Sequence, residues 1–251
     1  MNPDRLGVSQ PEYKYPPSHN PYWKKLRTSE EFAGRAYTDN DTELYVGHWR
    51  EHFPDAVSAG GNRSPERPLH VEIGCNAGHV VREWALRSPT HAYIGIDWKF
   101  KAICRAAEKA VARDIGNLLF FRAHAERIEF MFGPGEIDHL YLFFPDPWPK
   151  TSQSKNRFLT AGQFKKIARL IKTGGSFHIK TDHGEYFAAM EHAFNEVCGD
   201  WEVLERSNDL HRGHPNPREL TFPDVTLFER LFIKDGLPIH SLKLKRLGNG
   251  S

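Results

Sequence analysis

The 251-residue sequence predicts an α/β protein with a mostly parallel, twisted sheet and helices on both faces. The first observation is that short apolar runs, typical of buried strands, alternate with segments of helical periodicity. The second is that glycine- or proline-containing turns separate them. Strands joined by helices of this length form parallel sheets with right-handed crossovers. A third observation, two apolar runs around Asp235-Gly236, predicts an antiparallel hairpin at the C-terminal end.

Residues 1–67 are predicted to form an N-terminal arm and helix, and residues 68–251 the main domain. The arm is rich in Pro, Asn and Ser, and its helix is expected near 41–52, before Pro54. Strands are predicted at 69–73, 91–96, 117–122, 139–144, 176–180 and 201–206, with two more in 226–246. Helices are predicted between them at 79–87, 101–116, 160–172 and 184–197.

Local signals fix the ends of these helices. The helix at 79–87 stops before Pro89, and the alanines of 101–116 recur at helical spacing with Gly116 at the end. Gly174-Gly175 closes the helix at 160–172. "SAGGNRSPERP" (58–68) reads as the loop that leads into the main domain.

Composition and cysteine usage narrow the class of protein. The chain is 39% hydrophobic and 26% charged. It contains no run of about 18 apolar residues, so no membrane span is predicted. The N-terminus lacks the apolar region of a secretory signal, and the cysteines (Cys75, Cys104 and Cys198) suggest neither a disulfide framework nor a metal site. We therefore expect a cytoplasmic protein that holds no metal.

Positive charge gathers in one part of the chain. Between Pro147 and Thr181 there are basic residues but no Asp or Glu. The basic residues are Lys150, Lys155, Arg157, Lys165, Lys166, Arg169, Lys172 and Lys180. The run is either a surface for a polyanion or a solvated helix face. Lys180 and its strand neighbour His178 are expected on a solvent-facing side of their strand.

Ligands of open α/β sheets bind at the carboxyl ends of the strands. The first predicted strand of the main domain runs into "EIGCNAG", with Glu72, Gly74, Asn76 and Gly78. Glycines there let the backbone turn tightly and approach a ligand. The stretch departs from the dinucleotide pattern G-x-G-x-x-G, and it resembles the first motif of S-adenosylmethionine-dependent methyltransferases.

The next strand ends at "GIDW". Asp97 is placed to accept both hydroxyls of a ribose, and Trp98 is either an adenine contact or part of the core. Dehydrogenases share this spacing, so the position of Asp97 alone leaves both kinds of cofactor open.

The fourth strand of the main domain runs into "FFPDPWPK". Three prolines at alternate positions exclude helix and a central strand, because each lacks a backbone donor. We expect Asp146 between them to be held rigidly after a strand, an arrangement that is common in methyltransferases acting on nitrogen and that dehydrogenases do not need. Trp148 either contacts the substrate base or packs the loop down.

The string "FFPDPWPK" resembles the signature of the tRNA (guanine-N7)-methyltransferase family. The resemblance extends in order over about 180 residues, through "EIGCNAG", "GID", "FHIKTDHGEYF" and "TLFERLFIKDGLPI". It implies a Rossmann-like class I methyltransferase that transfers a methyl group from S-adenosylmethionine to a tRNA guanosine, usually at position 46 in the variable loop.

The resemblance also implies roles for individual residues. Asp146 would be catalytic and would also touch the cofactor. The other cofactor-binding positions would be Glu72, Gly74, Asn76, Gly78, Asp97, Trp98, His124 and Ala125. The substrate-binding positions would be Lys150, Asp182, Thr226, Phe228 and Glu229.

This sequence departs from the family's pattern at several positions. Asn76 replaces the middle glycine of the first motif, and His124-Ala125 stands where an Asp or Asn usually precedes Ala. The stretch after the signature, "TSQSKNR", is less basic than usual, and Leu227 replaces a residue that is usually polar. These changes suggest a divergent member with an altered grip on tRNA.

The chemistry of guanine N7 suits this set of residues. Its lone pair is free at neutral pH, so catalysis requires orientation rather than a general base. A carboxylate can accept from the guanine edge and stabilise the charge that methylation creates. The basic run and the aromatic residues of the arm (Tyr13, Tyr15, Tyr22 and Trp23) would hold phosphates and stack on bases.

Alternatives remain open at this point. The chain could be a methyltransferase of the same fold acting on another amine or base, or a non-catalytic relative that only binds tRNA. A dinucleotide oxidoreductase is the third alternative. The expected partner is tRNA, and the protein would be a monomer or a homodimer.

Overall fold

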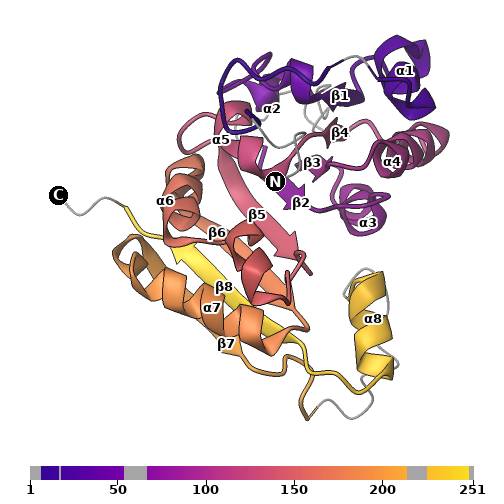
Figure 1. Ribbon diagram of the computed structural model, residues 1–251. Coiled ribbons are helices and arrows are strands. Elements are labelled where there is room, and N and C mark those ends of the chain that lie inside the picture. Colours follow the sequence, from indigo (N-terminus) through magenta and orange to yellow (C-terminus); the bar gives the residue numbers. More distant parts are fainter. Residues whose placement is uncertain (1–6, 17, 54–66, 214–224, 249–251) are drawn as a thin grey trace. The chain divides into compact units, whose positions relative to one another are not determined.

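The computed structural model describes residues 7–16, 18–53, 67–213 and 225–248 (Figure 1). The chain divides into two compact units, Met1–Glu136 and Ile137–Ser251. The expected boundary between an arm and a main domain at 67/68 stays a prediction, and residues 58–66 of the expected loop lie outside the described residues. No helix of the described chain is long and apolar enough to cross a membrane.

The first unit alternates helices and strands. Its helices are α1 (Pro21–Thr28), α2 (Trp49–His52), α3 (His79–Arg87), α4 (Phe100–Ala112) and α5 (Ile128–Met131), with 3₁₀ turns η2 (Glu30–Phe32), η3 (Asp39–Asp41) and η4 (Ala125–Arg127). Its strands are β1 (Ala36–Thr38), β2 (Leu69–Ile73), β3 (Ala92–Asp97) and β4 (Leu118–Arg122).

The strands of the first unit are parallel and lie in the order β1-β4-β3-β2. Val71 pairs with Ile94, which in turn pairs with Leu119, so the carboxyl ends of these strands meet at one edge. β2, β3 and β4 follow the predicted ranges closely. The sequence pattern did not predict β1, because it assigned residues 36–38 to an irregular arm.

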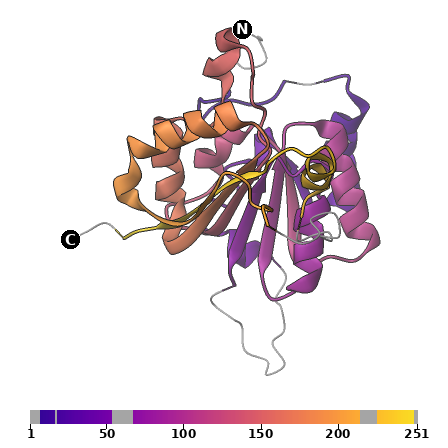
Figure 2. The same ribbon diagram turned by 90° about the horizontal axis from the view of Figure 1, so that it is seen from below.

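Both faces of this sheet are covered. On one face, α1, α3 and α4 pack through a buried cluster that includes Leu26, Val81, Ile103 and Phe120. On the other face, Trp49 of α2 is fully buried and its ring lies 5.1 Å from that of Phe121. The predicted helices on both faces are therefore confirmed for this unit (Figure 2).

The second unit has a mixed sheet. Its helices are α6 (Ala161–Leu170), α7 (Gly184–Asn195) and α8 (Leu227–Lys234), with 3₁₀ turns η5 (Thr151–Asn156) and η6 (Cys198–Asp200). Its strands are β5 (Ile137–Phe143), β6 (Ile171–Thr181), β7 (Trp201–Ser207) and β8 (His240–Arg246).

These strands lie in the order β5-β6-β8-β7. β5 and β6 are parallel, whereas β8 is antiparallel to both β6 and β7. α6 and α7 pack together, and Phe164 of α6 contacts Phe177 of β6 and Phe194 of α7 at 6.1 and 5.7 Å between ring centroids. The predicted antiparallel arrangement at the C-terminal end is confirmed.

The prediction of the first strand of the hairpin is wrong. Residues 227–234 form helix α8, and only the second run, at 240–246, is a strand. Thr226 begins the helix with a capping box: the Glu229 N–H donates to Thr226 Oγ1, and the Thr226 N–H donates to the Glu229 carboxylate, both at 3.0 Å. The predicted helix at 41–52 is also shorter in the structure, because only 49–52 are α-helical.

Candidate cofactor and substrate sites

The turn after β2 has the conformation that its glycines suggested. Gly74, Asn76 and Gly78 all have positive φ, at +80°, +50° and +64°. A Cβ on Gly78 would stand 2.7 Å from the ring of Phe120, whereas a Cβ on Gly74 would meet nothing within 4 Å. Space is therefore open in front of Gly74, where a ligand can approach the backbone.

Asn76 occupies its position without a change of turn. Asparagine tolerates the left-handed region better than most residues, and the Asn76 N–H donates to Asp97 Oδ2 at 3.0 Å. The Lys99 N–H donates to Asp97 Oδ1 at 2.8 Å. Each oxygen of a carboxylate accepts about two hydrogen bonds, which suits Asp97, only 9% exposed, to hold the turn and ribose hydroxyls together.

Glu72 is buried below this turn, and the Val81 N–H donates to its Oε2 at 3.2 Å. Burial, opposed by the hydrogen bond from the Val81 N–H and assisted by the nearby Asp97, raises the pKa of Glu72 to about 8. A cation placed beside a buried carboxyl of this kind lowers its pKa and favours the charged carboxylate.

Two aromatic rings stand at the ends of β3 and β4. The Trp98 side chain is 51% exposed, and its ring lies nearly parallel to that of His124, at 6.1 Å and 20°. Ala125 follows as the first residue of η4. The open turn, a carboxylate and an exposed ring fit a nucleoside cofactor, and all the predicted cofactor positions except Asp146 lie in this unit.

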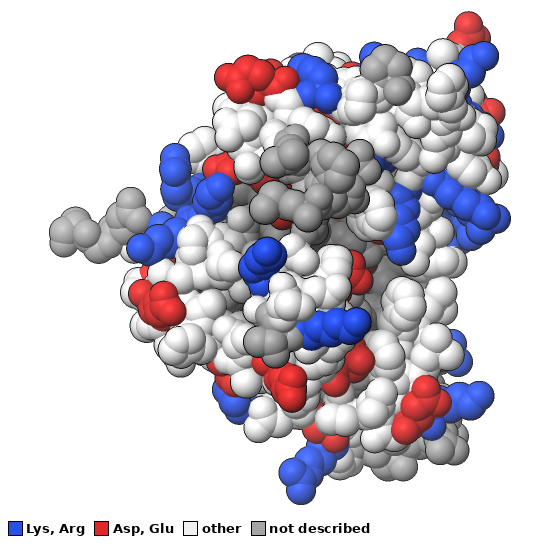
Figure 3. All heavy atoms as spheres, in the orientation of Figure 1, with Lys and Arg blue, Asp and Glu red and all other residues white. Residues whose placement is uncertain are grey.

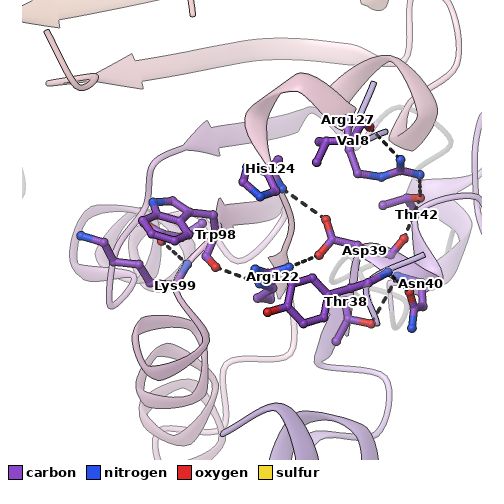
Figure 4. A network of polar contacts seen from close by, with 12 residues as sticks. Val8, Thr38, Asp39, Asn40, Thr42, Trp98, Lys99, Arg122, His124 and Arg127 are labelled. Atoms are coloured by element: carbon purple, nitrogen blue, oxygen red, sulfur yellow. Dashed lines mark hydrogen bonds and ion pairs between the residues drawn. The ribbon is translucent and has the colours of Figure 1, made fainter. Parts of the chain in front are cut away.

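Two residues beside this site were not predicted from the sequence. Asp39, fully buried just after β1, forms an ion pair with Arg122 at the end of β4 (Figure 4). Ligands bind at the carboxyl ends of the strands, so Asp39 would have been a candidate if the three-residue β1 had been predicted. The single arginine closing "LLFFR" was the other available signal.

In the second unit, the loop after β5 holds Asp146 between two strained positions. Phe144 and Trp148 have positive φ, at 53° and 45°, which is rare for aromatic residues. The Phe144 N–H donates to the Lys180 carbonyl at 2.8 Å, and Arg157 Nε donates to the Pro147 carbonyl at 2.9 Å. These contacts pin the loop on both sides of the exposed Asp146 side chain.

The remaining predicted substrate residues differ in their exposure. Lys150 is exposed at the end of the loop and Asp182 is half-buried after β6. Phe228 is 49% exposed on the first turn of α8, whereas Glu229 next to it is fully buried.

Glu229 is engaged on both oxygens. Lys180 Nζ lies 2.9 Å from Oε1 and 3.1 Å from Oε2, His211 Nε2 lies 2.7 Å from Oε1, and the Thr226 N–H reaches Oε2. The carboxylate thus fixes the start of α8 to β6. The sequence grouped Thr226 with Glu229 as substrate-binding residues, a role that stays a prediction, but it did not reveal Lys180 as the partner of Glu229.

The expectation that Lys180 and His178 face solvent is wrong. Lys180 is buried and paired with Glu229. His178 lies 3.0 Å from Ser241 Oγ, and burial, with Lys180 and Lys243 nearby, lowers its pKa to about 3. The side of β6 that carries both residues is covered, because β8 and the start of α8 contribute partners to it.

Not all residues of the basic run lie on the surface. Lys150, Lys155, Lys165, Arg169 and Lys172 are exposed, but Arg157 and Lys180 turn inward to support the loop and α8. Basic and acidic side chains are interspersed over the face seen in Figure 3.

The aromatic residues of the arm are engaged with the protein. Tyr15, Tyr22 and Trp23 pack against the buried cluster of the first unit. The ring of Tyr15 lies edge-on to Phe100, at 5.1 Å between centroids. These residues are half-buried, and their expected stacking on RNA bases stays a prediction. The described residues contain no group of His, Cys, Asp and Glu that could hold a metal.

Comparison with known proteins supports this description. The model of a family described as "Putative methyltransferase" matches residues 66–242. The tRNA (guanine-N(7)-)-methyltransferase of Listeria monocytogenes serotype 4b is 32% identical over 90% of this chain and 96% of its own. A bifunctional glycosyltransferase/methyltransferase of Fusobacterium nucleatum is 29% identical over 92% of this chain, which spans 33% of that protein's length.

Among solved structures, the 16S rRNA methyltransferase KamB superposes with a TM-score of 0.54. The match covers 74% of this chain and 91% of that one at 15% identity, so it bears on the fold alone. The predicted Rossmann-like fold, the enzyme class and S-adenosylmethionine as methyl donor are confirmed. The chain belongs to the tRNA (guanine-N(7)-)-methyltransferase family.

Proposed function

We propose that the protein transfers a methyl group from S-adenosylmethionine to N7 of a guanosine in tRNA, at position 46 of the variable loop. The observation that carries the proposal is the rigid loop around Asp146. Its carboxylate is exposed between two strained, pinned positions, in a chain whose relatives are named for this reaction.

S-adenosylmethionine supplies the electrophilic methyl group. In the proposal, Asp97 accepts the ribose hydroxyls, the open backbone at Gly74 admits the ligand, and Trp98 offers its exposed ring to the adenine. Glu72 would respond to the ammonium group of the cofactor by losing its proton, because a cation favours the charged carboxylate.

Asp146 has the central part in the proposed chemistry. Guanine N7 carries no proton, so the reaction needs a held geometry rather than a base. The Asp146 carboxylate would accept from the guanine edge and stabilise the positive charge that develops on the purine. The loop holds that carboxylate in place before substrate arrives, since prolines and Arg157 fix its backbone.

The other substrate residues divide into contacts and supports. Lys150 and Asp182, both accessible, suit a phosphate and the guanine edge. Phe228, also accessible, suits stacking on a base. Thr226 and Glu229 hold the first turn of α8, and thereby Phe228, in position.

Replacement of guanine N7 by carbon tests the proposal. A tRNA transcript made with 7-deazaguanosine keeps the Watson–Crick edge but lacks the acceptor atom. The expected result is methyl transfer to the ordinary transcript and none to the 7-deaza transcript. Transfer to both would point to another amine or base, and tRNA binding without any transfer would point to a non-catalytic relative.

Two further expectations follow from the same proposal. A tRNA substrate implies action in the cytoplasm. One chain carries the whole set of proposed cofactor- and substrate-binding residues, which is compatible with either a monomer or a homodimer.

A further inference from the structure

Arg122 connects three segments of the first unit. Its Nε donates to the carbonyl of Trp98 at 2.8 Å, and its Nη1 pairs with Asp39. The guanidinium lies 4.1 Å from the ring centroid of Tyr15 and 4.0 Å from that of Phe100. This buried cation is therefore held by the N-terminal segment on one side and by the segment after β3 on the other.

Asp39 completes the connection. β1 pairs in parallel with β4, Thr38 beside Arg122, so Asp39 follows directly at the carboxyl ends of these strands. One of its oxygens pairs with Arg122, and the other accepts the N–H of His124 at 3.3 Å. Figure 4 shows Asp39 between Arg122 and His124.

Arg127 fastens the same N-terminal segment a second time. It is fully buried in η4, and its guanidinium donates to the carbonyls of Val8 and Gln10, each at 3.0 Å, and to Thr42 Oγ1 at 3.0 Å. Stretches at both ends of 8–42 are thus bound to the turn that follows His124.

The segments held in this way are the ones that carry the proposed adenosine contacts. Arg122 fixes the backbone of Trp98, which stands between Asp97 and Lys99. Asp39 fixes the backbone of His124, whose ring lies nearly parallel to the Trp98 ring. The separation of the two rings therefore depends on one ion pair whose acidic member comes from the N-terminal segment.

We propose that Asp39 and Arg122 are positioning residues for the adenosine end of S-adenosylmethionine. Through the ion pair between Asp39 and Arg122, the N-terminal segment 7–42 influences the affinity of the protein for its cofactor. The inference rests on the proposed cofactor site but assigns no step of the methyl transfer to either residue.

The physical basis is the cost of leaving a buried charge unpaired. Asp39→Asn keeps the size of the side chain but leaves the guanidinium of Arg122 without its counterion. The guanidinium can then regain a partner only by moving, which shifts the Trp98 carbonyl. A displacement of a ligand-contacting segment by about 1 Å can reduce binding or rate by as much as about a hundredfold.

The test is titration of the full chain with S-adenosylhomocysteine, together with steady-state methylation of tRNA. For Asp39→Asn we expect the dissociation constant and the KM for S-adenosylmethionine to rise about tenfold or more, with little change in the KM for tRNA. A general loss of folding would not separate the two KM values.

Asp41→Asn is the matched control. Asp41 lies in the same turn, accepts the N–H and hydroxyl of Thr38 at 2.9 and 2.8 Å, and contacts neither Arg122 nor His124 in the described chain. It should leave cofactor affinity close to that of the unaltered protein. Arg122→Lys is a second test if Asp39→Asn fails to fold, because it keeps the charge but cannot reach both Asp39 and Trp98.

Unchanged cofactor affinity in Asp39→Asn or in Arg122→Lys would overturn the inference, as would an equal loss in Asp41→Asn. These outcomes differ from a failure of the proposed function. If the unaltered protein binds S-adenosylhomocysteine but methylates no tRNA, the proposed function fails, and the affinities of the variants still decide the inference.

Discussion

At the scale of single residues, Asp146 is the group on which the proposed chemistry depends most. Asp146→Asn removes the charge but keeps the side chain's size, and the residue is exposed, so the fold should persist. We expect kcat to fall about a hundredfold or more, because stabilisation of the developing charge is lost. Steady-state methylation at saturating cofactor and tRNA measures this effect.

Asp235→Asn provides the comparison for this variant. Asp235 is an exposed acid at the end of α8, also in the second unit, and its replacement should leave kcat unchanged. A normal kcat in Asp146→Asn would remove Asp146 from the reaction.

Glu72 gives a prediction about pH. Its pKa is about 8 in the folded protein and is near 4.5 when unperturbed, so the folded state retains a proton that the unfolded state loses. This contribution to stability is fully present below pH 4.5 and is lost as pH rises through 8. The side chain introduced by Glu72→Gln does not titrate. The unfolding free energy of this variant should therefore rise relative to that of the unaltered protein, by up to about 1.4 kcal/mol per pH unit between pH 5 and 8.

Urea unfolding of both proteins, without cofactor, at several pH values measures this difference. A difference in unfolding free energy that stays constant from pH 5 to 8 would show that Glu72 is ionised in the folded protein. Addition of S-adenosylmethionine should narrow the difference, since the ammonium group favours the charged form of Glu72.

The sequence revealed residues whose role follows from a strong local pattern. Glu72 and Asp97 lie at the carboxyl ends of the well-formed apolar strands β2 and β3, and Gly74 follows β2, so a search of the strand ends found all three. Asp39 follows a strand of three residues that pairing with β4, rather than its own composition, stabilises. Lys180 was misread because its partner Glu229 lies 49 residues away in the chain.

At the scale of elements, α8 shows how a local signal can be overlooked. The apolar residues of "TLFERLFIK" suggested a strand, but Thr226 and Glu229 have the spacing of a capping box. The helix buries Glu229 and exposes Leu227, Phe228 and Leu231. The burial of Glu229 depends on tertiary contacts, because Lys180 and His211 supply its partners.

The ion pair between Glu229 and Lys180 predicts a coupling between their substitutions. Glu229→Gln should lower the unfolding free energy by about 3 kcal/mol, because Lys180 is left buried without a counterion. Adding Lys180→Met should restore part of that loss, whereas Thr226→Ala should cost only about 1 kcal/mol. Denaturant unfolding of the single and double variants measures the coupling.

Arg230→Gln serves as control for this set, since Arg230 is exposed on the same turn of α8. Equal effects of Glu229→Gln and Arg230→Gln, or strict additivity in the double variant, would contradict a buried, coupled pair.

At the scale of the whole molecule, the class of fold and the order of most elements could be predicted from periodicity and turns. The partition of the chain into units at Glu136/Ile137 could not, since it depends on which distant segments pack together. The N-terminal segment shows the same limit: its strand and its half-buried aromatic residues are stabilised by β4 and α4. Composition alone described this segment only as an arm.

Membership in the family and the geometry of the two sets of site residues support methylation of a tRNA guanosine at N7, and our central proposal is that this guanosine is at position 46. The most direct test is transfer of labelled methyl from S-adenosylmethionine to an unmodified tRNA transcript and to the same transcript with adenosine at position 46. The prediction is label as N7-methylguanosine on the first transcript and none on the second. Equal labelling of both transcripts, or no label on either while the protein binds tRNA, would contradict the claim.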